Sequence, residues 1–190
     1  MTETKPRYHH GDLPSTLLHS ARVLLEQDGI AALKLRAITR HAGVSATAAT
    51  PHFGNLSGVL SALAAIGFNE LTAAMSNTAH KTMRDIGLAY IRFAIANPGL
   101  FTLMFRNDSV DRTTPDLKNA SEKALACLAH LPSDTPSSSP LDKAAQMASA
   151  WAKVHGLAIL AIDGQLQALT PQPLTPILLE KLLANTLSLK

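Results

Sequence analysis

The sequence predicts an all-α protein of about nine helices. Hydrophobic residues make up 46% of the 190-residue chain, yet aromatic residues make up only 4%. Alanine and leucine dominate, which favours closely packed helices over a sheet rich in β-branched and aromatic residues. Apolar residues also recur at helical spacing along the chain, without the alternation typical of strands. A chain of this length can bury a core without a staple, and its single cysteine, Cys127, excludes an internal disulfide and a cysteine metal site.

Four helical segments are expected in the first part of the chain. A leucine stripe over residues 13–28 predicts the first helix, which Gly29 ends. Residues 35–42 predict a short second helix, after which Gly43 supplies the positive φ of a tight exit. Ser45 is expected to cap a third helix, and a fourth begins near Leu56 and continues for more than 20 residues.

The rest of the chain predicts five more helices and one clear loop. Residues 132–140 hold three prolines and four serines in nine positions, which cannot sustain a periodic element. A second loop is expected around Gly164, Pro171 and Pro173. The predicted helices cover residues 82–97, which Pro98 stops, then 99–105, 115–131, 141–163 and 174–189.

Two short helices joined at Gly43 fit a DNA-binding helix-turn-helix, although an ordinary helical corner needs the same glycine. The net charge of +3 and the isoelectric point near 9.2 are compatible with a polyanionic partner. Up to residue 60 the chain has six Lys and Arg against four acidic residues. The modest excess of positive charge therefore lies at the end that holds the helix-turn-helix.

Four stretches together resemble one family of proteins. These are YHHGDL from Tyr8, LLEQDGIAALKLRAITRHAGVS through the turn, HF at 52–53, and WAKVHGLA from Trp151. In order and spacing the chain resembles a TetR/AcrR-type transcriptional regulator, of the group with a Trp-His-Gly signature in its C-terminal domain. The resemblance implies a three-helix DNA-binding head at residues 9–55, with the helix-turn-helix at about 34–53. It also implies a connecting helix at 56–80 and a ligand-binding and dimerisation body at 81–190.

The resemblance implies a homodimer whose last two helices pair with their symmetry mates. The residues themselves agree, because the apolar surface of 174–190 is wider than the stripe that faces one neighbour. The partners that we expect are therefore operator DNA, a second copy of the chain and a small-molecule effector.

Matching residue by residue assigns the positions that would contact DNA. Lys34 and Arg36 would hold phosphates, and Lys5 and Arg7 lie in an arm that could follow a groove. The full assigned set is Lys34, Arg36, Ser45, Ala46, Thr47, Ala48, Thr50 and His52.

The chain departs from the family pattern at four of its positions near DNA. Family members usually have Tyr where this chain has Thr50, often Arg or another large residue at Pro51, and Lys at Leu56. Lys34 replaces the usual Ser or Thr cap of the second helix. These departures predict a weaker or less usual operator specificity.

Pro51 leaves two registers open for the third helix. If Ser45 caps it, Pro51 is its sixth residue and costs roughly 3 kcal/mol, so the helix ends early or bends. If Thr50 is the cap, Pro51 is a favourable first residue, but Gly54 ends the helix almost at once. The first register is the one that we favour from the sequence.

The resemblance also places a small-molecule site in the C-terminal body. Large apolar side chains there could line a pocket or form plain core, and His155 is equally a core histidine or a ligand contact. An apolar ligand at this site would shift the fourth helix and so change the spacing of the recognition helices. The candidate lining residues are Phe93, Phe101, Met104, Phe105, Met147, Trp151 and His155.

Other classes of function find little support. The chain has no paired Glu-x-x-His motif, glycine-rich phosphate loop, nucleophile elbow or zincin motif. We therefore expect no enzyme activity, catalytic residue, cofactor or metal. No apolar run reaches the ~18 residues needed to span a bilayer, and the N-terminus lacks a signal-peptide pattern, which predicts a cytoplasmic protein without a membrane partner.

The sequence thus predicts a ligand-responsive transcriptional regulator, a repressor that a small apolar effector releases. The alternative is a family member with weakened or lost DNA binding that acts as a ligand or protein adaptor. Thr50, Pro51 and Leu56 are the residues that favour this alternative.

Overall fold

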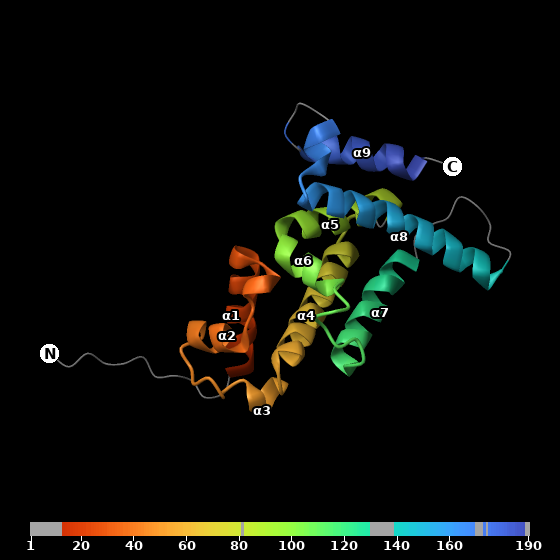
Figure 1. The fold of residues 1–190 in the computed structure, drawn as a ribbon. Coiled ribbons are helices and arrows are strands. Elements are labelled where there is room, and N and C mark those ends of the chain that lie inside the picture. The colour runs from red at the N-terminus through yellow and green to blue at the C-terminus, as the bar shows by residue number, and fades with distance from the viewer. Residues whose placement is uncertain (1–12, 81, 130–138, 170–172, 174, 189–190) are drawn as a thin grey trace.

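The computed structural model describes residues 13–80, 82–129, 139–169, 173 and 175–188 (Figure 1). Within these residues it has nine α-helices, two short 3-10 helices and no strand, which confirms the predicted all-α class. The α-helices are α1 Leu13–Asp28, α2 Leu35–His41, α3 Thr50–Phe53, α4 Leu56–Ser76, α5 Met83–Ala96, α6 Pro98–Met104, α7 Pro115–Ala129, α8 Pro140–Ile162 and α9 Pro176–Ser188. The 3-10 helices are η1 Ile30–Ala32 and η2 Gln165–Leu169.

Most expected helices are found close to their predicted limits, and the differences lie in the loops. The first helix has the predicted limits, because its leucine stripe ends at Gly29, whose φ is +74°. The loop expected over 164–173 instead begins with η2, whose Leu166 is buried. The expected proline-rich loop falls mainly on residues 130–138, outside the described part, while Ser139 caps α8 and Pro140 begins it.

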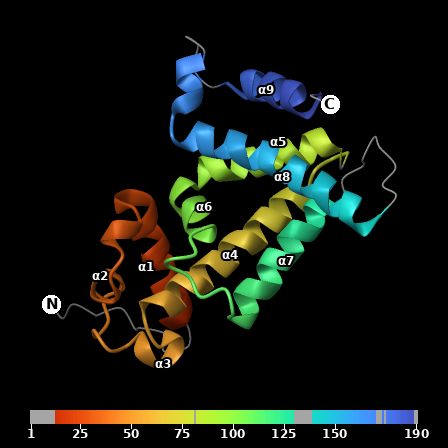
Figure 2. The ribbon, with the colours of Figure 1, turned by 45° about the vertical axis from the view of Figure 1, so that its right-hand side comes forward.

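The helices form a small head and a larger body, joined by α4 (Figures 1 and 2). In both views α1, α2 and α3 gather near the start of α4, α7 runs beside α4, and α5, α8 and α9 lie beyond its other end. The core of the head includes Leu17, Leu25 and Ile38, whose exposed fractions are 0%, 1% and 0%. These residues come from the stripes that predicted the first two helices.

The fourth helix is the central packing element. It contacts α1, α5, α6 and α7. By length and composition it is the only single helix in the described part that could cross a membrane, which corrects the expectation that no segment is apolar enough. Because 56% of its most apolar window is buried inside the fold, we interpret α4 as a core helix.

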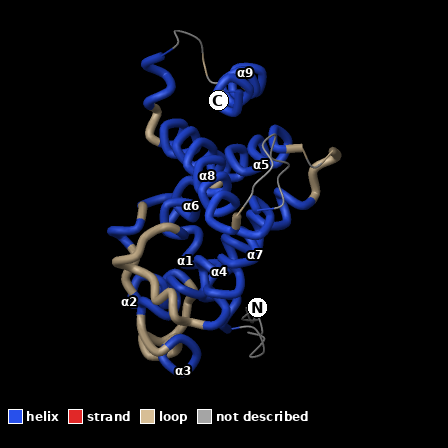
Figure 3. Tube along the Cα trace, turned by 90° about the vertical axis from the view of Figure 1, so that its right-hand side faces the viewer, coloured by secondary structure: helices blue, strands red, loops and turns tan. Residues whose placement is uncertain are grey.

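The body ends in a layer made of α5, α8 and α9. Figure 3 shows α9 beyond α8 and α5, on the side away from the head. A Cβ added at Gly87 of α5 would lie 3.1 Å from Leu183 of α9 and 3.2 Å from Val154 of α8, so the three helices approach closely at this glycine. Glu180 of α9 pairs with Arg84 and Arg92 of α5 at 3.1 and 3.5 Å.

Candidate functional site

The corner between α2 and α3 has the predicted turn. Gly43 has a φ of +70°, and the amide of Val44 donates to the carbonyl of Thr39 at 3.0 Å. The second helix begins without a side-chain cap, because Lys34 at its N-cap accepts no bond from the first turn. The helix-turn-helix corner is therefore present, with the weak start expected from the loss of a Ser or Thr cap.

The segment after this corner corrects the favoured register. Residues 46–49 form turns, and regular helix covers only Thr50–Phe53. The hydroxyl of Ser45 lies 3.4 Å from that of Thr47, and it caps no helix. Pro51 sits in the first turn, where its missing amide costs no helical bond, so the observed helix is close to the register that starts at Thr50. Gly54, with a φ of +71°, then ends the helix.

We call residues 45–53 the recognition segment. Backbone hydrogen bonds between residues three positions apart stabilise its turns. The amide of Ala48 donates to the carbonyl of Ser45 at 3.0 Å, and the amide of Thr50 donates to the carbonyl of Thr47 at 3.2 Å. Ala49 is fully buried and anchors the segment. The predicted contact residues Ser45, Ala46, Thr47, Thr50 and His52 are exposed, and Ala48 is half-buried.

The predicted phosphate-holding residues flank this segment only in part. Lys34 and Arg36 are both exposed at the start of α2. Lys5 and Arg7, expected in an N-terminal arm, lie outside the described residues. At the start of α4, where a lysine would reach a phosphate, Leu56 is half-buried and packs against the core. The described head therefore offers exposed short polar and methyl groups, with cations on one side.

A close backbone contact joins the recognition segment to α4. Asn55 caps α4 through its side-chain oxygen, which accepts a hydrogen bond from the amide of Gly58 at 3.0 Å. A Cβ added at Gly58 would lie 1.9 Å from the carbonyl oxygen of Phe53, a distance that no real contact permits. The absence of a side chain at Gly58 therefore permits the close turn from α3 into α4.

Two charged side chains of α1 fasten the head to the body. Glu26 accepts hydrogen bonds from the amides of Gly99 and Leu100, both at 2.9 Å, in the first turn of α6. Arg22 donates to Glu70 of α4 at 2.9 Å and to the side-chain oxygen of Asn97 at 2.7 Å. Asn97 lies where α5 and α6 meet with a bend of 110°. A movement of α6 would therefore be transmitted to α1.

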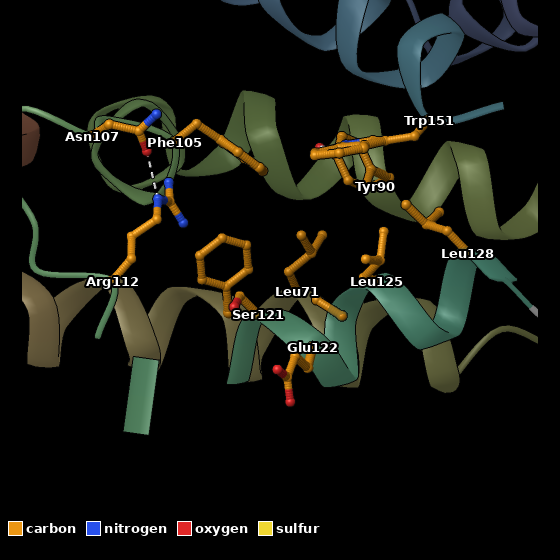
Figure 4. A pocket seen from close by; sticks show the side chains of 12 residues that line it. Leu71, Tyr90, Phe105, Asn107, Arg112, Ser121, Glu122, Leu125, Leu128 and Trp151 are labelled. Atoms are coloured by element: carbon orange, nitrogen blue, oxygen red, sulfur yellow. Dashed lines mark hydrogen bonds between the residues drawn. The ribbon is translucent and has the colours of Figure 1, made fainter. Parts of the chain in front are cut away.

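A cavity of about 480 Å³ lies in the body, with α4 and α7 together on one side and α5 on the other (Figure 4). Its walls come from α4, α5, the end of α6 and the following loop, α7 and α8. Such a volume suits a small organic ligand. The lining residues are Phe68, Leu71, Tyr90, Phe105, Asn107, Arg112, Ser121, Glu122, Ala124, Leu125, Leu128 and Trp151.

Two of the seven predicted lining residues, Phe105 and Trp151, line this cavity. Three others belong to the core, because Phe101 and Met104 have no exposed surface and Phe93 is 8% exposed. Met147 is half-buried and does not line the cavity, because it lies one turn before Trp151, nearer the start of α8. His155 does not line the cavity itself, but it contacts Tyr90, which does.

His155 belongs to a hydrogen-bonded group that closes one end of the cavity. The indole of Trp151 donates to the hydroxyl of Tyr90 at 3.3 Å, and this hydroxyl lies 2.8 Å from Nδ1 of His155. Burial raises the pKa of the Tyr90 hydroxyl and lowers that of His155, which favours the neutral forms of both groups. When the neutral imidazole carries its proton on Nε2, Nδ1 accepts a hydrogen bond from the Tyr90 hydroxyl, which itself accepts one from Trp151.

Several lining residues were not anticipated from the sequence. Tyr90 shares the 83–96 helix with Phe93, and a polar aromatic residue in an apolar stripe was the available signal for it. Leu125 and Leu128 look like any leucines of an amphipathic helix, and only tertiary packing leaves room beside them. Arg112 lies in a loop, where spacing gives no direction to its side chain.

Comparison with known proteins covers both parts of the chain. Residues 17–63 match the family model for bacterial regulatory proteins of the tetR family. Residues 83–184 match the model for the tetracyclin repressor-like C-terminal domain. No curated protein matches the chain.

Solved structures with the same fold cover nearly the whole chain. A protein of unknown function from Rhodococcus sp. RHA1 is 28% identical over 95% of this chain and 94% of its own, with a TM-score of 0.73. A TetR family transcription regulator from Marinobacter aquaeolei VT8 is 14% identical over 91% and 92%, with a TM-score of 0.62. The multidrug binding protein EbrR, solved with imidazole, is 19% identical over 96% and 93%, with a TM-score of 0.54.

Proposed function

The chain belongs to the TetR family of bacterial regulatory proteins, and from this premise we propose that it is a transcriptional repressor released by a small, largely apolar effector. Family membership gives it an N-terminal DNA-binding domain and a ligand-binding C-terminal domain. We further propose the division into a head at 9–55, a connecting segment at 56–80 and a body at 81–190. It acts in the cytoplasm, without catalytic residues, cofactor or metal.

The observation that carries this proposal is the course of α4. Its first turn holds the recognition segment through Gly58, and its later residues Phe68 and Leu71 line the cavity. A ligand that repositions this helix would therefore move the surface that meets DNA. The similarity in fold to a multidrug binding protein is consistent with a small-molecule cavity in the body.

The proposed operator contacts are those of the exposed residues around the corner. Ser45, Thr47 and Thr50 supply hydrogen bonds to base edges, and the methyl groups of alanine and threonine suit thymine methyls. Lys34 and Arg36 hold phosphates. The proposed DNA-binding set is Lys34, Arg36, Ser45, Ala46, Thr47, Ala48, Thr50 and His52.

A second copy of the chain is the proposed partner of α8 and α9. Leu160 of α8 is 41% exposed and Ile177 of α9 is 68% exposed. Gly156, one turn before Leu160, has no neighbour within 4 Å of an added Cβ, so another helix has room to approach. We expect Leu160→Glu with Ile177→Glu to convert a dimer into a monomer in analytical ultracentrifugation. A wild-type monomer at operator-binding concentrations would overturn the dimer.

Release follows from the spacing of the two heads in such a dimer. Successive major grooves on one face of DNA lie roughly 34 to 36 Å apart, and a ligand that changes this separation weakens binding. Linkage then requires operator DNA to weaken ligand binding by the same factor. Calorimetry of the effector with and without DNA tests this reciprocity.

Anisotropy titration of genomic fragments over a salt series tests DNA binding itself. Two phosphate-holding cations in each half-site predict a slope of about −3.6 in log affinity against log salt. Lys34→Gln should make that slope shallower by about 2, because the dimer loses two contacts. Lys118→Gln, an exposed lysine of α7, should leave it unchanged. If no fragment binds above the nonspecific level at low salt, the proposed repressor function is excluded.

The short, turn-rich recognition segment also bears on the adaptor alternative. Thr50→Tyr combined with Leu56→Lys restores the residues that relatives usually carry. In a working repressor this double variant should change affinity only modestly. In an adaptor it would create DNA binding where the wild type has almost none.

A further inference from the structure

Arg112 differs from the other arginines in the described part of the chain. Arg22, Arg84, Arg92 and Arg106 each pair with a carboxylate. Arg36 and Arg40 have no carboxylate partner among the described residues, but they are exposed to water. Arg112 is half-buried, lines the cavity and has no ion pair within the described residues. A partly desolvated cation in a cavity wall calls for an anionic partner.

The guanidinium of Arg112 is held in place by neutral acceptors. Nε donates to the side-chain oxygen of Asn107 at 2.5 Å, and Nη2 donates to the carbonyl of Met104 at 2.9 Å. This carbonyl belongs to the last turn of α6, whose partial negative charge favours a cation. The described bonds leave both protons of Nη1 without an acceptor. The group is therefore oriented and still able to donate.

The loop that carries Arg112 is fixed as well. The amide of Asp111 donates to the hydroxyl of Ser61 on α4 at 2.8 Å. Ser61 is 2% exposed, and its hydroxyl donates to the carbonyl of Ser57 at 2.7 Å. Arg112 is thus presented to the cavity from a buried anchor, which reduces the ordering cost of binding.

The rest of the cavity separates polar from apolar groups. In Figure 4, Arg112 and Asn107 lie toward one end, Trp151 and Leu128 toward the other, and Leu71 between them. Glu122 also lines the cavity, but it is exposed and its carboxylate points away from the other side chains in this view. At the far end the hydroxyl of Tyr90 is already engaged by Trp151 and His155, so that end offers a ligand mainly apolar surface.

We propose that the effector is an amphipathic monocarboxylate whose acid group pairs with Arg112 and whose apolar body extends past Leu71 toward Trp151. This inference rests on the proposed function, because it names the ligand class of the same cavity. The inference also refines the proposed effector class, since a wholly apolar ligand would leave the Arg112 guanidinium without an anionic partner.

Trp151 gives a direct readout, because it is the only tryptophan in the chain and it lines the cavity. Its fluorescence should report binding of decanoate and of 3-phenylpropanoate, which separate an aliphatic from an aromatic body. Decanoate should bind at least tenfold more tightly than 1-decanol or decylamine. Equal affinity for acid and alcohol, or preference for the amine, would overturn the proposal.

The variant Arg112→Gln should weaken decanoate binding about 10- to 100-fold, the range of a hydrogen bond to a charged group. Binding of 1-decanol should stay within about threefold. Arg112→Lys keeps the charge, so its affinity for decanoate should lie between those of the wild type and Arg112→Gln. The matched control is Arg106→Gln, in the same loop but outside the cavity, and it should bind decanoate as the wild type does. If Arg112→Gln keeps wild-type affinity for decanoate, the carboxylate assignment is wrong.

Brominated probes test the orientation of the ligand. Bromine quenches tryptophan only at contact, so 10-bromodecanoate should quench Trp151 strongly and 2-bromodecanoate weakly at equal occupancy. The opposite pattern would place the acid group near Trp151 and overturn the assignment. These measurements need no DNA. A result that overturns the repressor proposal in the anisotropy titration can therefore be told apart from a result that overturns carboxylate recognition in the fluorescence measurements.

Discussion

The two ends of α4 hold their neighbours in opposite ways. At the first turn, Gly58 allows the backbone of Phe53 to approach because it has no side chain, and Asn55 supplies one capping bond. About three turns further on, Glu70 binds Arg22 of α1, and Phe68 and Leu71 are 4% and 1% exposed beside the cavity. The recognition end depends on tight backbone geometry, whereas the cavity end depends on side chains. A ligand can therefore act at one end without contacting the other.

The largest expected effect breaks the recognition end. In Gly58→Ala the new Cβ meets the carbonyl of Phe53, so α3 or α4 must shift. Because the added Cβ clashes with backbone, the overpacking cost lies at the upper end of the usual range, at about 3 kcal/mol, against about 1 kcal/mol gained in helix propensity. We expect a net loss of about 2 kcal/mol in chemical denaturation, together with loss of operator binding. Ser57→Ala, the neighbouring control, should stay within about 0.5 kcal/mol and keep DNA binding.

The next largest effect is expected where α1 is bound to α4 near the cavity. Arg22→Met removes the bonds to Glu70 and Asn97 and leaves their oxygens to water. Because the Arg22 and Glu70 side chains are 29% and 39% exposed, we expect a loss of only about 1 kcal/mol. Effector binding should persist while effector-induced release of DNA diminishes. Arg92→Met removes a more exposed pair and serves as control. Undiminished release in Arg22→Met would exclude this contact from the coupling between the sites.

A smaller effect is expected from Pro51→Ala. The new amide can bond toward Thr47 and extend α3 backward, but the observed helix already avoids the clash that the proline would cause. We therefore expect a change in unfolding free energy below about 1 kcal/mol, with slower amide exchange at residues 49 and 50. Pro115→Ala, at the start of α7, should leave exchange in the recognition segment unchanged. Faster exchange in Pro51→Ala would contradict the prediction.

The smallest effect is the pH dependence of the group that closes the cavity. Burial lowers the pKa of His155 in the folded state, so the unfolded state takes up a proton first as the pH falls. Its contribution to stability is complete above about pH 6.5 and is lost as the pH falls from there toward the folded pKa. His155→Gln keeps an acceptor for Tyr90 and does not titrate. The stability difference between wild type and this variant should narrow in denaturation curves at lower pH, and widening would contradict it.

The sequence predicts the long helices well because their stripes and breakers act locally. Leucine spacing and Gly29 define α1, and Pro98 separates α5 from α6 in the structure as predicted. The recognition segment was misjudged because Ser45 is an attractive cap, while the conflict between Pro51 and the carbonyl of Thr47 is resolved by turns over 46–49. The capping preference of Ser45 is therefore outweighed by the missing amide of Pro51.

The cavity was harder to foresee because a cavity is what packing leaves unfilled. Phe101 and Met104 lie in the short apolar helix α6, which Phe105 directly follows, yet only Phe105 reaches the empty space. The orientation of α6, set by the 110° bend at Asn97, decides between them. Arg112 reaches the cavity through a loop anchored at Ser61, a contact between residues 50 positions apart that no local pattern predicts.

The brevity of the recognition segment bears on how such a regulator finds its target among competing sequences. Each good contact to a base edge discriminates by about 1 to 3 kcal/mol, and a genome offers roughly 10⁶ to 10⁹ nonspecific sites. Three short polar side chains on one head supply too little discrimination to outweigh that competition, whereas two heads acting together double the information that is read. Occupancy of the target would then rise steeply with the cellular concentration of the protein, and halving its expression would relieve regulation more than proportionally.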